Sequence, residues 1–112
     1  MPTVLYEDAA LLVLEKPAGL LSVPGLGPDK QDCLSTRVQR RYADALIVHR
    51  LDMSTSGLML MARGKAAQSM LSRHFAERRV TKRYQALVLG QVPRTAEIWN
   101  DIDLPISIDW PR

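Results

Sequence analysis

A polar segment of nine residues, His49 to Gly57, lies between two short apolar runs, Ile47-Val48 and Leu58 to Met61. Apolar runs of this length, bounded by polar residues, are typical of strands in a buried sheet. The segment between them carries an imidazole, an arginine, an aspartate and three hydroxyl groups. Loops held at both ends by a rigid sheet commonly bear binding and catalytic groups. The pattern therefore predicts a sheet protein whose chemistry lies on this loop.

The rest of the chain predicts a mixture of strands and helices. Residues 22–31 contain two prolines and two glycines and are expected to form an irregular loop. We expect one amphipathic helix of about ten residues after a cap at Asp32, and a second from Lys65 to about Arg78. Alternating or continuous apolar residues predict four further strands: Val4–Tyr6, Ala10–Glu15, Tyr84–Leu89 and Ala96–Leu104. The predicted class is α+β, with a largely antiparallel sheet flanked by helices.

Charge is distributed unevenly along the chain. Residues 63–84 carry seven basic side chains against one glutamate, whereas residues 1–29 and 95–112 are each acidic. A basic cluster is expected of a protein that binds a phosphate-rich partner, although a solvated basic helix face would look the same. No apolar run is long enough to span a membrane, and the first residues do not resemble a signal peptide. One cysteine excludes an internal disulfide, so we expect a cytoplasmic protein.

The polar loop has a purely structural interpretation as well as a catalytic one. Arg50 and Asp52 could form an ion pair that only stabilises the loop. The hydroxyl groups of residues 54–56 could cap backbone groups, and Gly57 could supply a positive φ angle. Spacing alone does not separate these alternatives.

The loop closely resembles the H-R-L-D-x-x-T-S-G signature of the RluA family of RNA pseudouridine synthases. Residues 16–25 resemble the K-P-x-G-L stretch of that family, residues 81–86 its K-x-Y-x-A strand, and residues 103–106 its D-L-P-[IL] segment. The resemblance covers nearly the whole chain and is nearest to the short members that lack an added RNA-binding domain. All seven fixed positions of the signature are matched, by His49, Arg50, Leu51, Asp52, Thr55, Ser56 and Gly57.

The resemblance implies a pseudouridine synthase catalytic fold and an RNA uridine isomerase. Such an enzyme breaks the N1–C1′ bond of a flipped uridine and rejoins the base through C5. Asp52 would be the catalytic carboxylate, as nucleophile or as base. Arg50 would fill the gap left by the base or contact a phosphate, and Tyr84 would stack on the uracil. The short members act on large-subunit ribosomal RNA and on the tRNA anticodon arm.

Further residues are expected to support RNA binding, mainly through the phosphate backbone. No metal cluster, P-loop or dinucleotide pattern is present in the sequence, and an isomerisation needs no redox partner, so no metal and no cofactor are expected. For each loop residue the alternative to RNA binding is a structural role, and each basic residue in or after the second helix could instead be an ordinary solvated surface charge. The candidates for RNA binding are His49, Thr55, Arg73, Arg78, Arg79, Lys82 and Arg83.

The C-terminal residues predict that residues 1–112 form the N-terminal part of a catalytic domain. Apolar residues persist almost to Arg112, and the R-x-H-Q-[IL]-R motif that follows in the RluA family is missing from the sequence. An incomplete sheet would favour self-association through unpaired strand edges. The alternative function is a catalytically silent RNA-binding module, in which the basic helix binds phosphate and the Asp52 loop is only structural.

Overall fold

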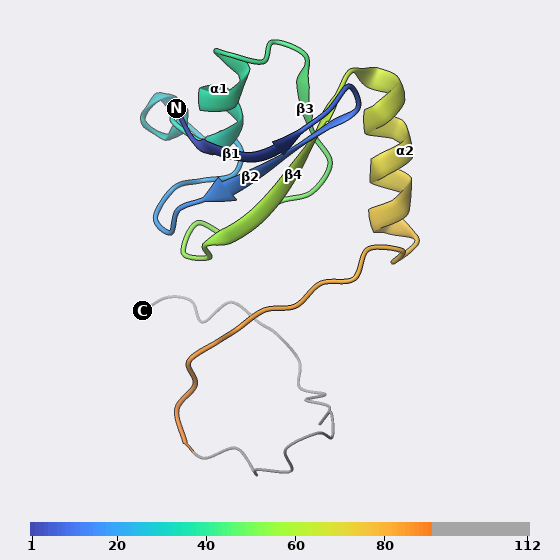
Figure 1. Cartoon of the computed structure of the whole chain (residues 1–112). Helices are drawn as coiled ribbons and strands as arrows, with labels where there is room; N and C mark the ends of the chain where they lie inside the picture. The colour runs from blue at the N-terminus through green and yellow to red at the C-terminus, as the bar shows by residue number, and fades with distance from the viewer. Residues whose placement is uncertain (91–112) are drawn as a thin grey trace. The chain divides into compact units, whose positions relative to one another are not determined.

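The computed structural model describes residues 1–90 (Figure 1). Its sheet consists of β1 (Thr3–Glu7), β2 (Leu11–Lys16), β3 (Ala45–Ile47) and β4 (Gly57–Arg63). The strands are ordered β1-β2-β4-β3, and each neighbouring pair is antiparallel. The predicted antiparallel α+β class is confirmed, as are the first two strands.

Alternation along β2 and β4 builds one buried face of the sheet. Leu12 pairs with Met61 and Leu14 pairs with Met59, and all four side chains are fully buried. Successive side chains on a strand point to opposite faces, so this alternation places the four on the same side. Lys16 continues the same alternation one step further.

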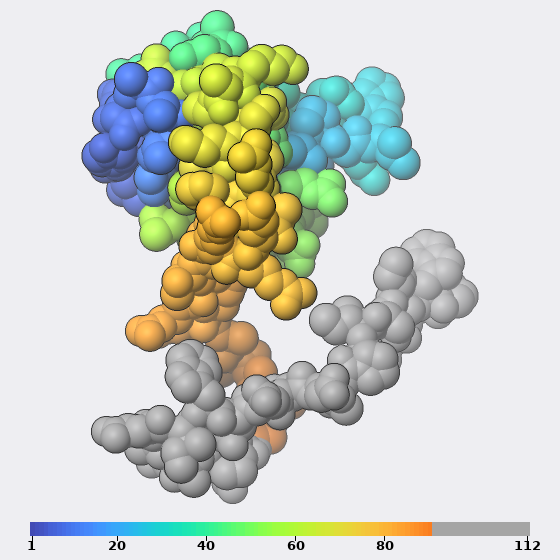
Figure 2. Space-filling view, turned by 90° about the vertical axis from the view of Figure 1, so that its right-hand side faces the viewer, coloured from blue at the N-terminus to red at the C-terminus, as the bar shows by residue number. Residues whose placement is uncertain are grey.

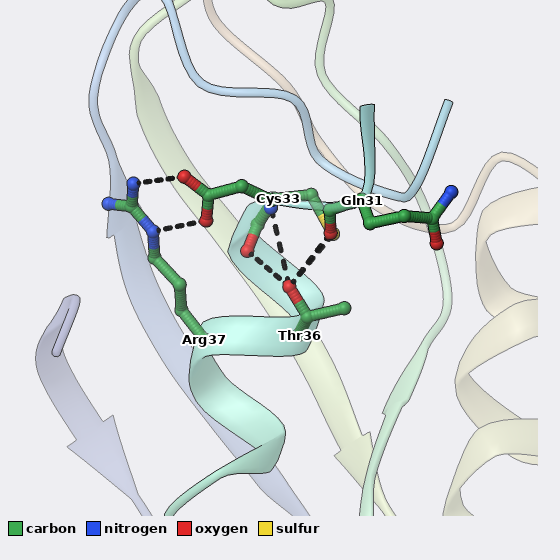
Figure 3. A network of polar contacts seen from close by, with 5 residues as sticks. Gln31, Cys33, Thr36 and Arg37 are labelled. Carbon is green, nitrogen blue, oxygen red and sulfur yellow. Dashed lines mark hydrogen bonds and ion pairs between the residues drawn. The ribbon is translucent and has the colours of Figure 1, made fainter. Parts of the chain in front are cut away.

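Helix α1 (Leu34–Gln39) covers this buried face. Leu34 and Val38 are fully buried and belong to the same cluster as the sheet residues, together with Tyr42 just beyond the helix. The helix is shorter than predicted, and its N-cap is Cys33 rather than Asp32. Cys33 has the extended backbone that a cap needs, and Thr36 accepts its N–H, whereas the carboxylate of Asp32 is held by Arg37 (Figure 3).

Helix α2 (Lys65–Ala76) follows β4 and packs along β4 and β3. Its buried residue, Leu71, lies outside the α1 cluster, and the two helices stand on different sides of the sheet (Figures 1 and 2). The predicted helix is confirmed, although one of its apolar side chains, Met70, is exposed. Within residues 1–90, no helix is long and apolar enough to cross a membrane.

The chain divides into two units, one ending at Lys82 and the other beginning at Arg83. The described part of the second unit, residues 83–90, contains no strand, so the predicted core strand Tyr84–Leu89 is wrong. Leu87 and Leu89 are fully exposed. An extended segment becomes a strand only when a neighbour takes its backbone hydrogen bonds, and none of the described residues does so here. The predicted strand Ala96–Leu104 lies outside the described residues.

Candidate active site

The polar loop connects β3 to β4 and presents Asp52 to solvent. Leu51 is buried in the core cluster, while Arg50 and Asp52 on either side of it are exposed. An apolar anchor between two outward-facing charged residues fixes the backbone and leaves both charges accessible. The loop closes with a turn in which the Thr55 N–H donates to the Asp52 carbonyl over 3.0 Å.

Lys16 lies beneath the loop with its side chain fully buried. Its Nζ donates to the carbonyls of Pro17 (2.9 Å), Leu20 (2.6 Å) and Met53 (3.1 Å), and Met53 is the residue after Asp52. Burial lowers the pKa of Lys16, and the negative charge of Asp52 opposes this shift. The loop backbone is therefore held by a cation whose field also reaches Asp52.

The segment that follows β2 supplies two more contacts to the loop. The Gly19 N–H donates to the Met53 carbonyl over 2.7 Å. The Ser22 hydroxyl donates to the Leu51 carbonyl at 2.6 Å and accepts the Leu51 N–H at 3.0 Å. Gly19 has a φ of 89°, a conformation that an L side chain rarely adopts. The loop is thus fixed on both sides of Asp52, at Leu51 and at Met53.

His49 ties the start of the loop to helix α2. Its ring stacks on Phe75 with centroids 4.4 Å apart, and its Nε2 accepts the Leu60 N–H over 2.9 Å. An accepting Nε2 carries no proton, so this ring is neutral. Burial lowers the pKa of His49, and the charge of Lys82, which lies over the Phe75 ring, lowers it further. In the structure His49 has a positioning role in the loop.

The structural alternative for the loop is only partly supported. Among the ion pairs of residues 1–90, none joins Arg50 to Asp52. Gly57 does have a positive φ, 134°, as the turn interpretation predicts. Both charged side chains therefore remain available to a substrate, on a backbone that the turn helps to shape.

The basic candidates fall into two groups. Arg73, Arg78 and Arg79 are exposed around the C-terminal end of α2, near the Phe75 ring that contacts His49, although Arg79 forms a 3.0 Å ion pair with Glu77. Lys82 lies over the same Phe75 ring. Arg83 and Tyr84 belong to the second unit, where both are exposed.

Sequence reasoning missed Lys16 and Ser22 as residues that position the loop. The signal was available for Lys16, because it shares the inward side of β2 with Leu12 and Leu14. A lysine at a buried strand position needs acceptors, and the turn after Pro17 provides them. For Ser22 the sequence carried no comparable signal, since its partner Leu51 is distant in the chain.

Comparison with known proteins identifies the class. The RNA pseudouridylate synthase family matches residues 10–108, which include strands β2, β3 and β4 and the Asp52 loop. The chain belongs to this family.

Within the family, the chain is similar to dual-specificity RNA pseudouridine synthases called RluA. It is 47% identical to the Yersinia pestis protein, over 97% of this chain and 52% of that protein. The Escherichia coli K12 protein is 48% identical over 97% of this chain and 48% of its own length, so the chain spans about half of these relatives. A solved structure, human RNA pseudouridylate synthase domain containing 4, is 26% identical with a TM-score of 0.53, covering 68% of this chain and 30% of that one.

Proposed function

We propose that this chain supplies the Asp52-bearing part of an RNA uridine isomerase. The observation that carries the proposal is the geometry of the loop: Asp52 is exposed, while the residues before and after it are fastened by Ser22, Gly19 and Lys16. A reacting carboxylate must be accessible to substrate and held in place, because a displacement of about 1 Å can reduce a rate about a hundredfold.

The reaction requires Asp52 to act at the ribose of a flipped uridine. The N1–C1′ bond breaks, the base turns, a C5–C1′ bond forms, and the C5 proton is replaced by a proton on N1. An ionised aspartate can attack C1′ or remove a proton from the sugar. Arg50 is exposed two residues before Asp52 and is suited to occupy the space left by the flipped base. Tyr84 would stack on the flipped base.

Structured RNA as the substrate class is supported by the relatives and by the basic end of α2. The RluA relatives are described as dual-specificity enzymes, which favours structured ribosomal RNA and tRNA as targets of this chain. Contacts from basic side chains to phosphates would orient such an RNA without reading its sequence. These side chains are Arg73, Arg78, Arg79, Lys82 and Arg83. His49 and Thr55 would shape the loop that contacts the RNA. We expect this chain to act on such RNA in the cytoplasm.

Two observations favour the alternative of a silent RNA-binding module for residues 1–112 alone. Tyr84 is 60% exposed on a segment without regular structure, and the chain spans about half the length of its relatives. The edge strand β1 also leaves Leu5 and Tyr6 about half exposed, which favours self-association of the isolated chain. We therefore expect activity only when the rest of a catalytic domain is present.

A chimera tests this function directly. Residues 1–112 replace the matching segment of the Escherichia coli RluA protein, and tritium release from RNA labelled at uridine C5 is compared with that of the unaltered relative. We expect turnover within about tenfold of the relative. A folded chimera that binds RNA but releases no tritium would support the silent module instead.

A further inference from the structure

A hollow of about 570 Å³ lies beside helix α1, away from the residues already assigned to RNA. Asp32, Arg37, Arg40 and Arg41 line it, together with Met1. These arginines lie at and just beyond the C-terminal end of α1, and the basic residues of α2 lie on the other side of the sheet. The hollow is therefore a second basic surface of the first unit.

The charge of the hollow is fixed by how its arginines are paired. Arg37 holds Asp32 through two hydrogen bonds of 2.8 Å, which neutralises the one acidic side chain that lines the hollow among residues 1–90 (Figure 3). The hydrogen bonding from Arg37, together with the positive charges of Arg37 and Arg40, keeps the pKa of Asp32 below its usual range. Among residues 1–90, Arg40 and Arg41 have no ion-pair partner, so the hollow retains a net positive charge.

Arg41 is held in place by a neighbouring ring. Its guanidinium lies 5.4 Å from the centroid of Tyr42, and Arg63 lies at the same distance from that ring. Tyr42 itself is buried in the core cluster, so the platform under Arg41 is rigid. A guanidinium stacked on a ring still presents its N–H donors outward, in a fork that matches two phosphate oxygens.

Hydrogen bonds connect α1 to the Asp52 loop. The Ser35 N–H donates to the Ser22 carbonyl over 3.1 Å, and the Ser22 hydroxyl makes two bonds with Leu51. The Leu34 N–H also donates to the Leu21 carbonyl over 2.7 Å. A ligand held on α1 therefore has a fixed position relative to the candidate carboxylate.

We propose that Arg40 and Arg41 bind a backbone phosphate of the RNA substrate, as a contact separate from that of α2. This inference rests on the proposed function and extends it. RNA is the occupant that the charge favours, because an RNA stem bound at Asp52 is long enough to run along α1 to Arg40 and Arg41, which lie beyond the C-terminal end of that helix, close to Arg63 at the far end of β4.

The test is the salt dependence of affinity for a short RNA stem-loop, measured on the 112-residue chain. Arg40→Gln/Arg41→Gln should weaken binding and lower the log–log slope by about 1–2, because each phosphate contact contributes about 0.7–0.9. Arg40→Lys/Arg41→Lys keeps the charge and should keep the slope. Arg40→Gln alone leaves the Arg41–Tyr42 stack intact, and it should lower the slope by about half as much.

The outcomes separate this contact from the function itself. A slope and affinity unchanged by the double glutamine variant, but lowered by Arg73→Gln/Arg78→Gln, would overturn the α1 contact and leave the proposed function standing. An equal loss of salt slope in the glutamine and lysine variants would also overturn it, because lysine keeps the charge that a phosphate contact requires. If the wild-type chain shows no salt-dependent RNA binding, then residues 1–112 do not bind RNA and the α1 contact is wrong as well. The isomerase function would still be decided separately, by tritium release from the chimera.

Discussion

Lys16 shows how a single buried charge can organise a loop without being part of its chemistry. Three carbonyls converge on its ammonium group, one of them from the residue after Asp52. Lys16→Met would keep the side-chain length and leave these acceptors without a donor. We expect a loss of about 1–3 kcal/mol in the free energy of unfolding, the usual cost of unsatisfied buried polar groups.

Denaturant unfolding measures this loss, with Glu15→Gln as the matched control. Glu15 is the exposed neighbour on the same strand, and its substitution should change stability by less than about 0.5 kcal/mol. A Lys16→Met protein as stable as the wild type would show that burying the ammonium costs as much as its hydrogen bonds contribute.

His49 predicts a dependence of stability on pH. The folded state lowers the pKa of His49, whose ordinary value is 6.5, so the unfolded chain binds its proton at higher pH than the folded chain. The stability contributed by neutral His49 is complete above about pH 6.5 and is lost as the pH falls through the lowered value. Protonation would also break the bond from the Leu60 N–H.

Thermal unfolding between about pH 4.5 and 7.5 measures this dependence. His49→Asn should flatten it, and His74→Gln, a change at the other histidine of the chain, should leave it in place. A pH profile that survives the loss of His49 would assign it to other groups.

At the scale of the element, the end of α2 combines structural strain with a basic side chain. Arg78 has a φ of 56°, and the N–H groups of Arg78 and Arg79 donate to the carbonyls of Phe75 and His74. This pattern is a helix-ending motif that usually places glycine at the left-handed position. Arg78→Gly should raise the free energy of unfolding by about 1 kcal/mol, because glycine adopts this conformation without strain.

The same substitution should weaken RNA binding and lower its salt slope by about 1, if Arg78 contacts phosphate. Arg78→Ala is the control, since alanine removes the charge and keeps the strain. Urea unfolding and a binding titration of the two variants report both effects. Equal stability of the glycine and alanine variants would show that the left-handed conformation is not costly here.

The elements themselves were predictable where local pattern and tertiary contacts agree. The β1-β2 hairpin and α2 follow from their apolar spacing, and the structure has both. The cap of α1 was misplaced by one residue, because Asp32 bonds a side chain instead of the backbone. Tyr84–Leu89 has the composition of a strand, but composition cannot provide the neighbouring strand that a ladder needs.

At the scale of the whole molecule, the strand order explains why one loop can be held so firmly. Because β4 pairs with both β2 and β3, the segments after β2 and before β4 meet at the same end of the sheet. The pairing of Lys16 with Gly57 brings the two together. The loop residues could be predicted from the sequence through their signature. The hydrogen bonds of Lys16 and Ser22 to the loop join residues that are distant in the chain, so they could be found only from the fold.

The claim that Asp52 is the reacting carboxylate is tested most directly by one substitution in the Escherichia coli chimera. Asp52→Asn is nearly isosteric but can act neither as a nucleophile nor as a strong base. We predict that tritium release from labelled RNA falls to background while RNA affinity stays within a few-fold of the unsubstituted chimera. Turnover of more than a few per cent of that of the unsubstituted chimera would contradict the assignment.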